Sequence, residues 1–92
     1  MSYHIILKPG FEEDIKRHLK FGNKKLVLKV SGFLDELKEH PRTGTGKPEQ
    51  LKGQDEEVWS RRIDARHRLV YEIQEHELIV IAISAHGHYD NK

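Results

Sequence analysis

The sequence predicts an α+β fold in which two antiparallel N-terminal helices pack on a mainly antiparallel sheet of about four strands. Two segments with helical periodicity, residues 11–19 and 24–37, come first in the chain, and short strand-like runs fill the C-terminal half. A chain of 92 residues can bury only one core. We therefore expect one domain that spans residues 1–92.

Composition and charge exclude several classes of protein. Apolar residues make up 36% and charged residues 34% of the chain, a mixture that folds rather than staying disordered. Cysteine is absent, which excludes disulfides and thiolate metal sites. The N-terminus does not look like a signal peptide, and no apolar run approaches the ~20 residues that a membrane-spanning helix needs. We expect a cytoplasmic protein with no membrane association, whose net charge of +1 creates only a weak overall field.

The N-terminal half is expected to form one strand and two helices. Residues 3–8 have a β-rich centre and predict a strand near a sheet edge, which Pro9-Gly10 would end as a turn. A short amphipathic helix follows, because apolar residues recur at helical spacing at Phe11, Ile15 and Leu19. The second helix stops before His40-Pro41, and its apolar stripe consists of Leu26, Val30, Phe33, Leu34 and Leu37.

A glycine-rich loop over residues 42–53 separates the helices from a β-hairpin and carries Glu49 directly after a proline. The acidic run at residues 55–57 is expected to be a solvated turn. Hairpin strands are predicted at residues 59–64 and 67–74. After a turn at residues 75–77, the apolar run over residues 78–84 is typical of a central strand that is covered on both faces.

The hairpin holds four arginines where strands normally carry aromatic or β-branched residues: Arg61, Arg62, Arg66 and Arg68. Repeated cations in a hairpin indicate a face that meets an anion. Because side chains alternate between faces, Leu69 and Tyr71 should lie under the helices, whereas Arg62 and Arg68 should project from the open face. With Glu49 in the loop and His86 or His88 near the sheet rim, this face predicts phosphate chemistry.

Four motifs occur in order: Gly-Lys-Pro-Glu-Gln-Leu-Lys over residues 46–52, Trp-Ser-Arg-Arg-Ile over 59–63, His-Arg-Leu-Val-Tyr over 67–71, and His-Tyr at 88–89. Together they resemble the YoeB/Txe branch of the RelE/ParE toxin superfamily, over nearly the whole chain. The resemblance implies a bacterial toxin that enters the ribosomal A site and cuts mRNA there. It also implies a neutralising antitoxin of the Phd/YefM type.

The resemblance further implies residue roles: Glu49 matches the general base, Arg68 the phosphate-stabilising arginine and His88 the general acid. Other positions match residues that line the RNA site, namely Lys47, Lys52, Arg62 and Tyr89. Chemistry agrees with this assignment, because attack of a 2′-OH on its own phosphate needs a base, an acid and positive charge on the intermediate. Arginine suits the last role, since its fork grips two phosphate oxygens. We expect no metal and no cofactor.

Alternatives stay open at the level of sequence. Glu49 is also consistent with a solvated loop carboxylate, and Arg68 with an ion pair to Glu72. His86 competes with His88 for the role of acid, and the two are weakly consistent with half of a metal site. A non-enzymatic ParE-like toxin that inhibits gyrase, or a module whose basic hairpin docks acidic protein, is a different class of function. Either a monomer or a homodimer is compatible with the sequence.

The remaining histidines are expected to be ordinary. We expect His67 to be packed or capping on the helix-facing side of the sheet. Surface positions are expected for His4, His18, His40 and His76.

Overall fold

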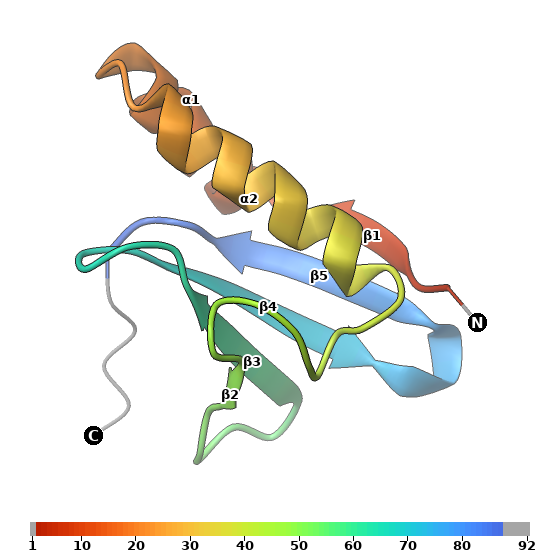
Figure 1. Cartoon of the computed structure of the whole chain (residues 1–92). Coiled ribbons are helices and arrows are strands. Elements are labelled where there is room, and N and C mark those ends of the chain that lie inside the picture. Colours follow the sequence, from red (N-terminus) through yellow and green to blue (C-terminus); the bar gives the residue numbers. More distant parts are fainter. Residues whose placement is uncertain (1, 88–92) are drawn as a thin grey trace.

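The computed structural model describes residues 2–87 and shows two helices lying across one face of a twisted sheet (Figure 1). The other face carries no helix among these residues. The elements in chain order are β1 (His4–Leu7), α1 (Pro9–Lys20), α2 (Lys24–Leu37), β2 (Glu49–Gln50), β3 (Glu57–Arg62), β4 (Arg68–Gln74), the 3₁₀ turn η1 (Glu75–Glu77) and β5 (Ile79–Ser84). The predicted α+β class and its two N-terminal helices are therefore confirmed.

The sheet has five strands in the order β1-β5-β4-β3-β2. Only β1 and β5 pair in parallel, so the sheet is mainly antiparallel and β1 lies at an edge, as predicted. The prediction of about four strands missed β2, which pairs Glu49 with Ser60 and Gln50 with Trp59. Two residues between a proline and a glycine turn show no periodicity, so this strand exists only because β3 offers it a partner.

Pro9 and Gly10 do not form the predicted turn, because they open α1. Proline fits the first turn of a helix, where its missing N–H would have no partner within the helix. The turn between the helices is short and includes Gly22 at φ 76°, so α1 and α2 run antiparallel. The buried stripe of α2 is the predicted one and packs on the sheet through Leu26, Val30, Phe33 and Leu37.

The prediction that the last strand is covered on both faces is wrong. β5 lies inside the sheet, but Val80 and Ala82 are fully buried under the helices while their neighbours are only partly buried. On the open face, Ile83 packs against a small second cluster formed by Leu51, Val58 and Val70. Among the described residues, the open face of β5 is therefore covered only by this local apolar cluster, to which Leu51 after β2 contributes, and not by a second layer of secondary structure.

The acidic run before β3 is not entirely the predicted solvated turn, because Glu57 is the first residue of β3. Its carboxylate takes two hydrogen bonds from Arg42, at 2.7 and 2.9 Å, and one from the indole of Trp59 at 2.8 Å. The bonds from Arg42 hold the pKa of Glu57 below its usual value, although burial opposes this shift. Arg42 also reaches Glu75 at 2.9 Å, so this cation is neutralised at the sheet end.

The hairpin arginines do not all face outward, because Arg61 is completely buried on the helix side of β3. Its guanidinium donates to the carbonyl oxygens of His40 at 2.6 Å, Thr43 at 2.7 Å and Thr45 at 3.2 Å, and it pairs with Glu36. Burial alone would raise the pKa of Glu36, but hydrogen bonds from Thr45 and Arg61 outweigh it and lower that pKa. The expectation that four arginines meet an anion is thus wrong for Arg61.

Tyr71 completes this buried network. Its hydroxyl donates to the Pro41 carbonyl at 2.7 Å and accepts from Nε of Arg61 at 3.2 Å. A buried carbonyl oxygen that accepts no hydrogen bond lowers the stability of the fold, because it has lost its contact with water. The two side chains therefore tie the loop that follows α2 to the centre of the sheet.

We expect Arg61→Met to lower the free energy of unfolding by about 3–5 kcal/mol, because it leaves Glu36 and three carbonyl oxygens without their donor. Arg62→Met, one residue further along β3 and exposed, is the matched control and should stay within about 0.5 kcal/mol of the wild type. Urea unfolding followed by Trp59 fluorescence measures both. Equal effects of the two substitutions would contradict the structural role of Arg61.

Candidate active site

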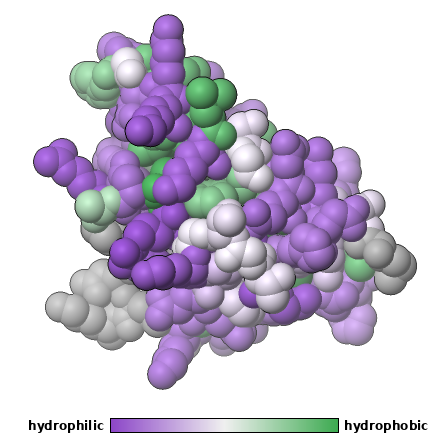
Figure 2. Space-filling model, viewed as in Figure 1, coloured by the Kyte–Doolittle hydropathy of each residue, from purple (hydrophilic) through white to green (hydrophobic). Residues whose placement is uncertain are grey.

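A hollow of about 460 Å³ lies on the open face of the sheet and is lined by Lys47, Pro48, Glu49, Arg62 and Arg68. Three cations and a carboxylate thus share one surface. Four of these residues are among those that the sequence predicted for the site. Hydrophilic side chains dominate the visible surface, and much of the exposed apolar area belongs to the helical layer (Figure 2).

Strand register explains why these side chains meet. β2 pairs Glu49 with Ser60, and β3 pairs Arg62 with Arg68. Directly paired residues project from the same face, and Ser60 and Arg62 are two positions apart on β3. Glu49, Ser60, Arg62 and Arg68 therefore all project from the open face, as the alternation in the sequence predicted for the two arginines.

Glu49 and Arg68 form the central pair of the hollow. Nη1 of Arg68 lies 3.9 Å from Oε1 of Glu49 and donates to Oγ of Ser60 at 3.2 Å. The side chain of Arg68 is 19% exposed and that of Glu49 is 68% exposed, so the arginine is held while the carboxylate reaches solvent. The alternative pairing of Arg68 with Glu72 is not observed, since the Glu72 carboxylate accepts from Gln74 instead.

Arg62 and Arg68 stand directly opposite each other in the ladder. Like charges in that position destabilise a sheet, and the nearby Glu49 carboxylate, 3.9 Å from Arg68, offsets only part of two positive charges. A phosphate bound in the hollow would relieve this repulsion. The pair therefore favours an anionic ligand over a purely structural role.

The loop before Glu49 is held closely against the rest of the fold. The carbonyl of Gly46 accepts from the Arg62 N–H at 2.7 Å. Gly46 has φ 81°, and a Cβ there would lie 2.7 Å from the ring of Phe33. Lys47 also adopts a left-handed conformation, at φ 50°, which is uncommon for a residue with a side chain. Such backbone conformations concentrate at functional sites.

Two further residues were not part of the sequence-based site. Ser60, 1% exposed, orients Arg68, and Gly46 brings the loop onto β3. Both residues stood in the motifs, Gly46 in the first and Ser60 in the second, but neither was assigned a role there. Lys52, predicted to bind RNA, is exposed just after Leu51 and does not line the hollow.

The predicted acid His88 and the predicted stacking residue Tyr89 lie outside the described residues. His86, the alternative candidate for the general acid, turns toward the helix side of the sheet. Its ring centre lies 5.5 Å from that of His18 and 5.0 Å from that of His67. His86 therefore belongs to a different face from Glu49 and Arg68.

The surface position expected for His18 is wrong. It is 5% exposed, and its Nε2 donates to the carbonyl of Ala85 at 2.8 Å. Its spacing from Phe11 and Ile15 places it on the buried stripe of α1, a signal that the sequence did contain. His67 is packed on the helix-facing side, as predicted.

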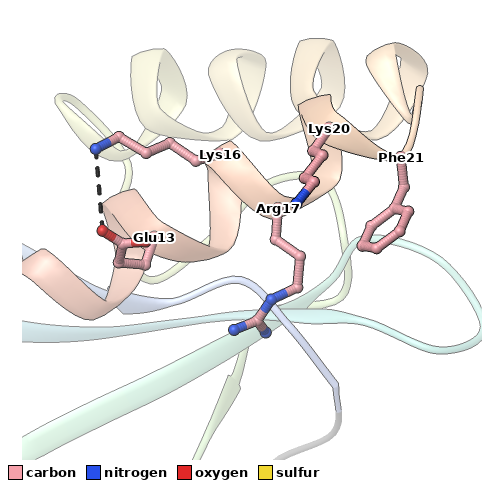
Figure 3. Close-up of a pocket in the computed structure, with 5 residues that line it drawn as sticks. All are labelled: Glu13, Lys16, Arg17, Lys20 and Phe21. Carbon is pink, nitrogen blue, oxygen red and sulfur yellow. Dashed lines mark ion pairs between the residues drawn. The ribbon is translucent and has the colours of Figure 1, made fainter.

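A second hollow, of about 340 Å³, lies beside α1 and is lined by Glu13, Lys16, Arg17, Lys20 and Phe21 (Figure 3). Lys16 and Glu13 pair across it at 3.9 Å, but both side chains are more than two-thirds exposed. Arg17 in its lining pairs with Asp14 at 3.7 Å but is 50% exposed, so it is less enclosed than Arg68. Within residues 2–87, no cluster of three or more possible ligands could hold a metal ion, and no helix is long and apolar enough to cross a membrane.

The arrangement of helices and strands defines the structural class of this protein. Two N-terminal helices on a mainly antiparallel five-stranded sheet are the RelE-like fold, which the chain shares with archaeal RelE in the RelE–RelB complex from Pyrococcus horikoshii. That match has a TM-score of 0.75 at 14% identity over 95% of this chain and 96% of that chain, and it concerns the fold alone.

The chain belongs to the family of YoeB-like toxins of bacterial type II toxin–antitoxin systems, whose model matches residues 9–89. It is 34% identical to toxin YoeB of Streptomyces coelicolor over 84% of this chain and 89% of that protein. Among solved structures, a YoeB/ParE toxin from Agrobacterium tumefaciens matches with a TM-score of 0.84 and 30% identity, covering 94% and 99% of the two chains.

The YoeB of Staphylococcus aureus is also similar, and it has been solved both as a dimer and in a YoeB–YefM complex. Its chain in the complex matches with a TM-score of 0.78 and 33% identity, and the dimer matches with 0.79 and 32%. In both cases the match covers 97% of this chain and 100% of that chain.

We expect Gly46→Ala to destabilise the fold by about 2–4 kcal/mol, because it adds a close contact with Phe33 to the cost of a positive φ. Gly53→Ala is the matched control, since Gly53 also has a positive φ, 77°, but a Cβ there meets open space. Its cost should be about 1 kcal/mol. Thermal unfolding of both variants checks the difference, and equal losses would contradict the close packing of the loop.

Proposed function

We propose that this chain is a ribosome-dependent endoribonuclease that cleaves mRNA in the ribosomal A site by metal-free acid–base catalysis. The observation that carries the proposal is the Glu49 carboxylate 3.9 Å from the anchored Arg68 on a basic open face. Membership in the YoeB-like toxin family supports the assignment of this face to RNA.

In the proposed reaction, Glu49 removes the proton from a ribose 2′-OH, and the 2′-oxygen attacks the adjacent phosphorus. The new O–P bond forms as the bond to the 5′-oxygen breaks. His88 donates a proton to that leaving oxygen, which leaves a cyclic 2′,3′-phosphate and a 5′-OH. The high exposure of Glu49 suits this role, because the base must reach a hydroxyl that arrives with the substrate.

Arg68 stabilises the phosphorane in this proposal, since a positioned cation acts most strongly where negative charge develops. Its hydrogen bond to Ser60 limits the directions in which the guanidinium can turn. Arg62 and Lys47, which line the same hollow, hold neighbouring phosphates. Lys52 contacts the RNA backbone further along, and Tyr89 stacks on a base.

The proposed partners follow from the same family. An antitoxin of the Phd/YefM type neutralises this toxin, as the YoeB–YefM complex of the Staphylococcus aureus relative suggests. A homodimer is the proposed free form, because that relative also forms a YoeB dimer. Action on ribosomes places the protein in the cytoplasm.

We expect Glu49→Gln and His88→Ala each to slow cleavage of translated mRNA by about 10²–10⁴-fold, because each removes a positioned proton-transfer group. Arg68→Lys should lose at least about tenfold, since an ammonium cannot grip two phosphate oxygens. Mapping of 5′ ends in a reconstituted translation reaction, with and without ribosomes, measures the rates. Glu39→Gln and His76→Ala, which change exposed residues away from the hollow, are the matched controls.

Cuts that appear only with ribosomes and fade in the three site variants would establish the function. Binding of the wild type to ribosomes without cleavage, with binding unchanged in Arg68→Lys, would instead favour a module that docks acidic protein. Inhibition of DNA gyrase without cleavage would indicate the ParE-like class. Either result would overturn the proposal.

A further inference from the structure

The chain segment that precedes His88 is held by side chains of α1. The N–H of Ala85 donates to Oδ2 of Asp14 at 3.0 Å, and the Ala85 carbonyl accepts from Nε2 of His18 at 2.8 Å. Asp14 and His18 are one helical turn apart on α1, so they meet both polar groups of one buried residue. This arrangement fixes the exit of the chain from β5.

Two more hydrogen bonds hold the next residues on the β4 side. The N–H of Gly87 donates to Nδ1 of His67 at 2.8 Å, and the Gly87 carbonyl accepts from the N–H of Arg68 at 3.0 Å. These four hydrogen bonds, all within the described part of the chain, hold residues 85–87. One of them involves the backbone of Arg68, the proposed phosphate-binding residue.

The hydrogen bonds require a proton on one ring nitrogen of His18 and its absence from one ring nitrogen of His67. His18 must carry a proton on Nε2, because a carbonyl can only accept. His67 must leave Nδ1 without a proton, because that atom accepts from Gly87, and so the ring is neutral. The rings of His18 and His67 also lie edge to face at 4.8 Å between centres, and His86 lies against both.

The surroundings of His67 oppose its protonation on balance. Burial, and the neighbouring His18, His86 and Arg66, hold the pKa of His67 below its ordinary value, while Asp64 acts in the opposite direction. The charged groups that face this cluster are Asp14 and Arg17 from α1, and Asp64 and Arg66 from the hairpin turn.

We propose that His18 and His67 are positioning residues that hold residues 85–87 and so place the start of the segment that carries His88, and that His67 does so only with Nδ1 unprotonated. Protonation of His67 breaks the hydrogen bond from the Gly87 N–H and leaves Gly87 bound, among residues 2–87, only through its carbonyl to the N–H of Arg68. This inference rests on the proposed function only in giving His88 the role of general acid. A protonated Nδ1 would point a donor at the N–H of Gly87, so the hydrogen bond is lost and repulsion replaces it.

The direction of the pH effect follows from linkage. A histidine whose pKa is lowered on folding binds fewer protons in the folded than in the unfolded chain, over the range just below its ordinary pKa of ~6.5. Stability is therefore complete above that range and decreases as the pH falls through it. The hydrogen bond from Gly87 to His67 should be lost over the same range, as the pH falls through the lowered pKa of His67.

The first experiment measures amide hydrogen exchange at Gly87 by NMR, expressed as a protection factor, for the full chain between pH 7.5 and pH 5. We expect His67→Leu to lower the protection of Gly87 by about five- to tenfold at pH 7.5, the effect of one lost hydrogen bond. His67→Asn should keep the wild-type value, because its Oδ1 can accept in place of Nδ1. His76→Leu, which changes an exposed histidine outside the cluster, is the matched control.

The pH series tests the inference in the wild type itself, without relying on a substitution that removes the hydrogen bond. Wild-type protection of Gly87 should decrease toward pH 5, whereas that of His67→Asn should stay level. Equal protection in wild type and His67→Leu, or the same pH dependence in wild type and His67→Asn, would overturn the inference.

The second readout is cleavage of translated mRNA. His67→Leu should lower kcat by about ten- to a hundredfold with little change in KM, because it displaces an acid without touching the RNA site, and His67→Asn should restore kcat. If the wild type cleaves but His67→Leu is as active, the inference fails and the proposed function stands. If the wild type does not cleave at all, the proposed function fails, and the exchange data still decide whether His67 holds the segment.

Discussion

The buried guanidinium of Arg61 is the interaction on which the rest of this structure depends. It enters the core from β3 and supplies hydrogen bonds to three loop carbonyl oxygens and to Glu36 at the end of α2. A charge in that position is tolerated only when every donor has an acceptor. The loop after α2 is therefore required to wrap around Arg61, and this wrapping carries the chain over the sheet edge to Glu49.

β3 joins the fold and the site because its side chains alternate between faces. Arg61 points to the core, while Ser60 and Arg62 on either side of it point to the open face. The same strand thus holds the loop through Arg61 on the helix side of the sheet and orients Arg68 through Ser60 on the open face. Gly46 adds to this link, since its carbonyl bonds to the N–H of Arg62 and only a residue without a side chain fits against Phe33.

The candidate site combines residues that are fixed by hydrogen bonds with side chains that are exposed to solvent. Arg68 is oriented by Ser60, and residues 85–87 are held by α1 and β4, whereas Glu49 reaches solvent and Arg62 faces another cation. An arrangement with opposed cations beside an exposed carboxylate suits an anionic substrate. This agrees with an enzyme whose substrate is RNA presented by a larger assembly, as proposed here.

The sequence by itself determined the fold class, both helices, the hairpin and the faces of Arg62 and Arg68, because hydrophobic periods of 3.6 and 2 are local properties of the chain. Only the tertiary structure decided that Arg61 is buried, that Glu49 lies on a two-residue strand, and that His18 contacts Ala85. Each of these depends on a partner that is distant in sequence, such as the His40–Thr45 carbonyls for Arg61 and β3 for Glu49. Local propensity cannot reveal such partners, because burial and hydrogen bonding are settled only when the elements pack together.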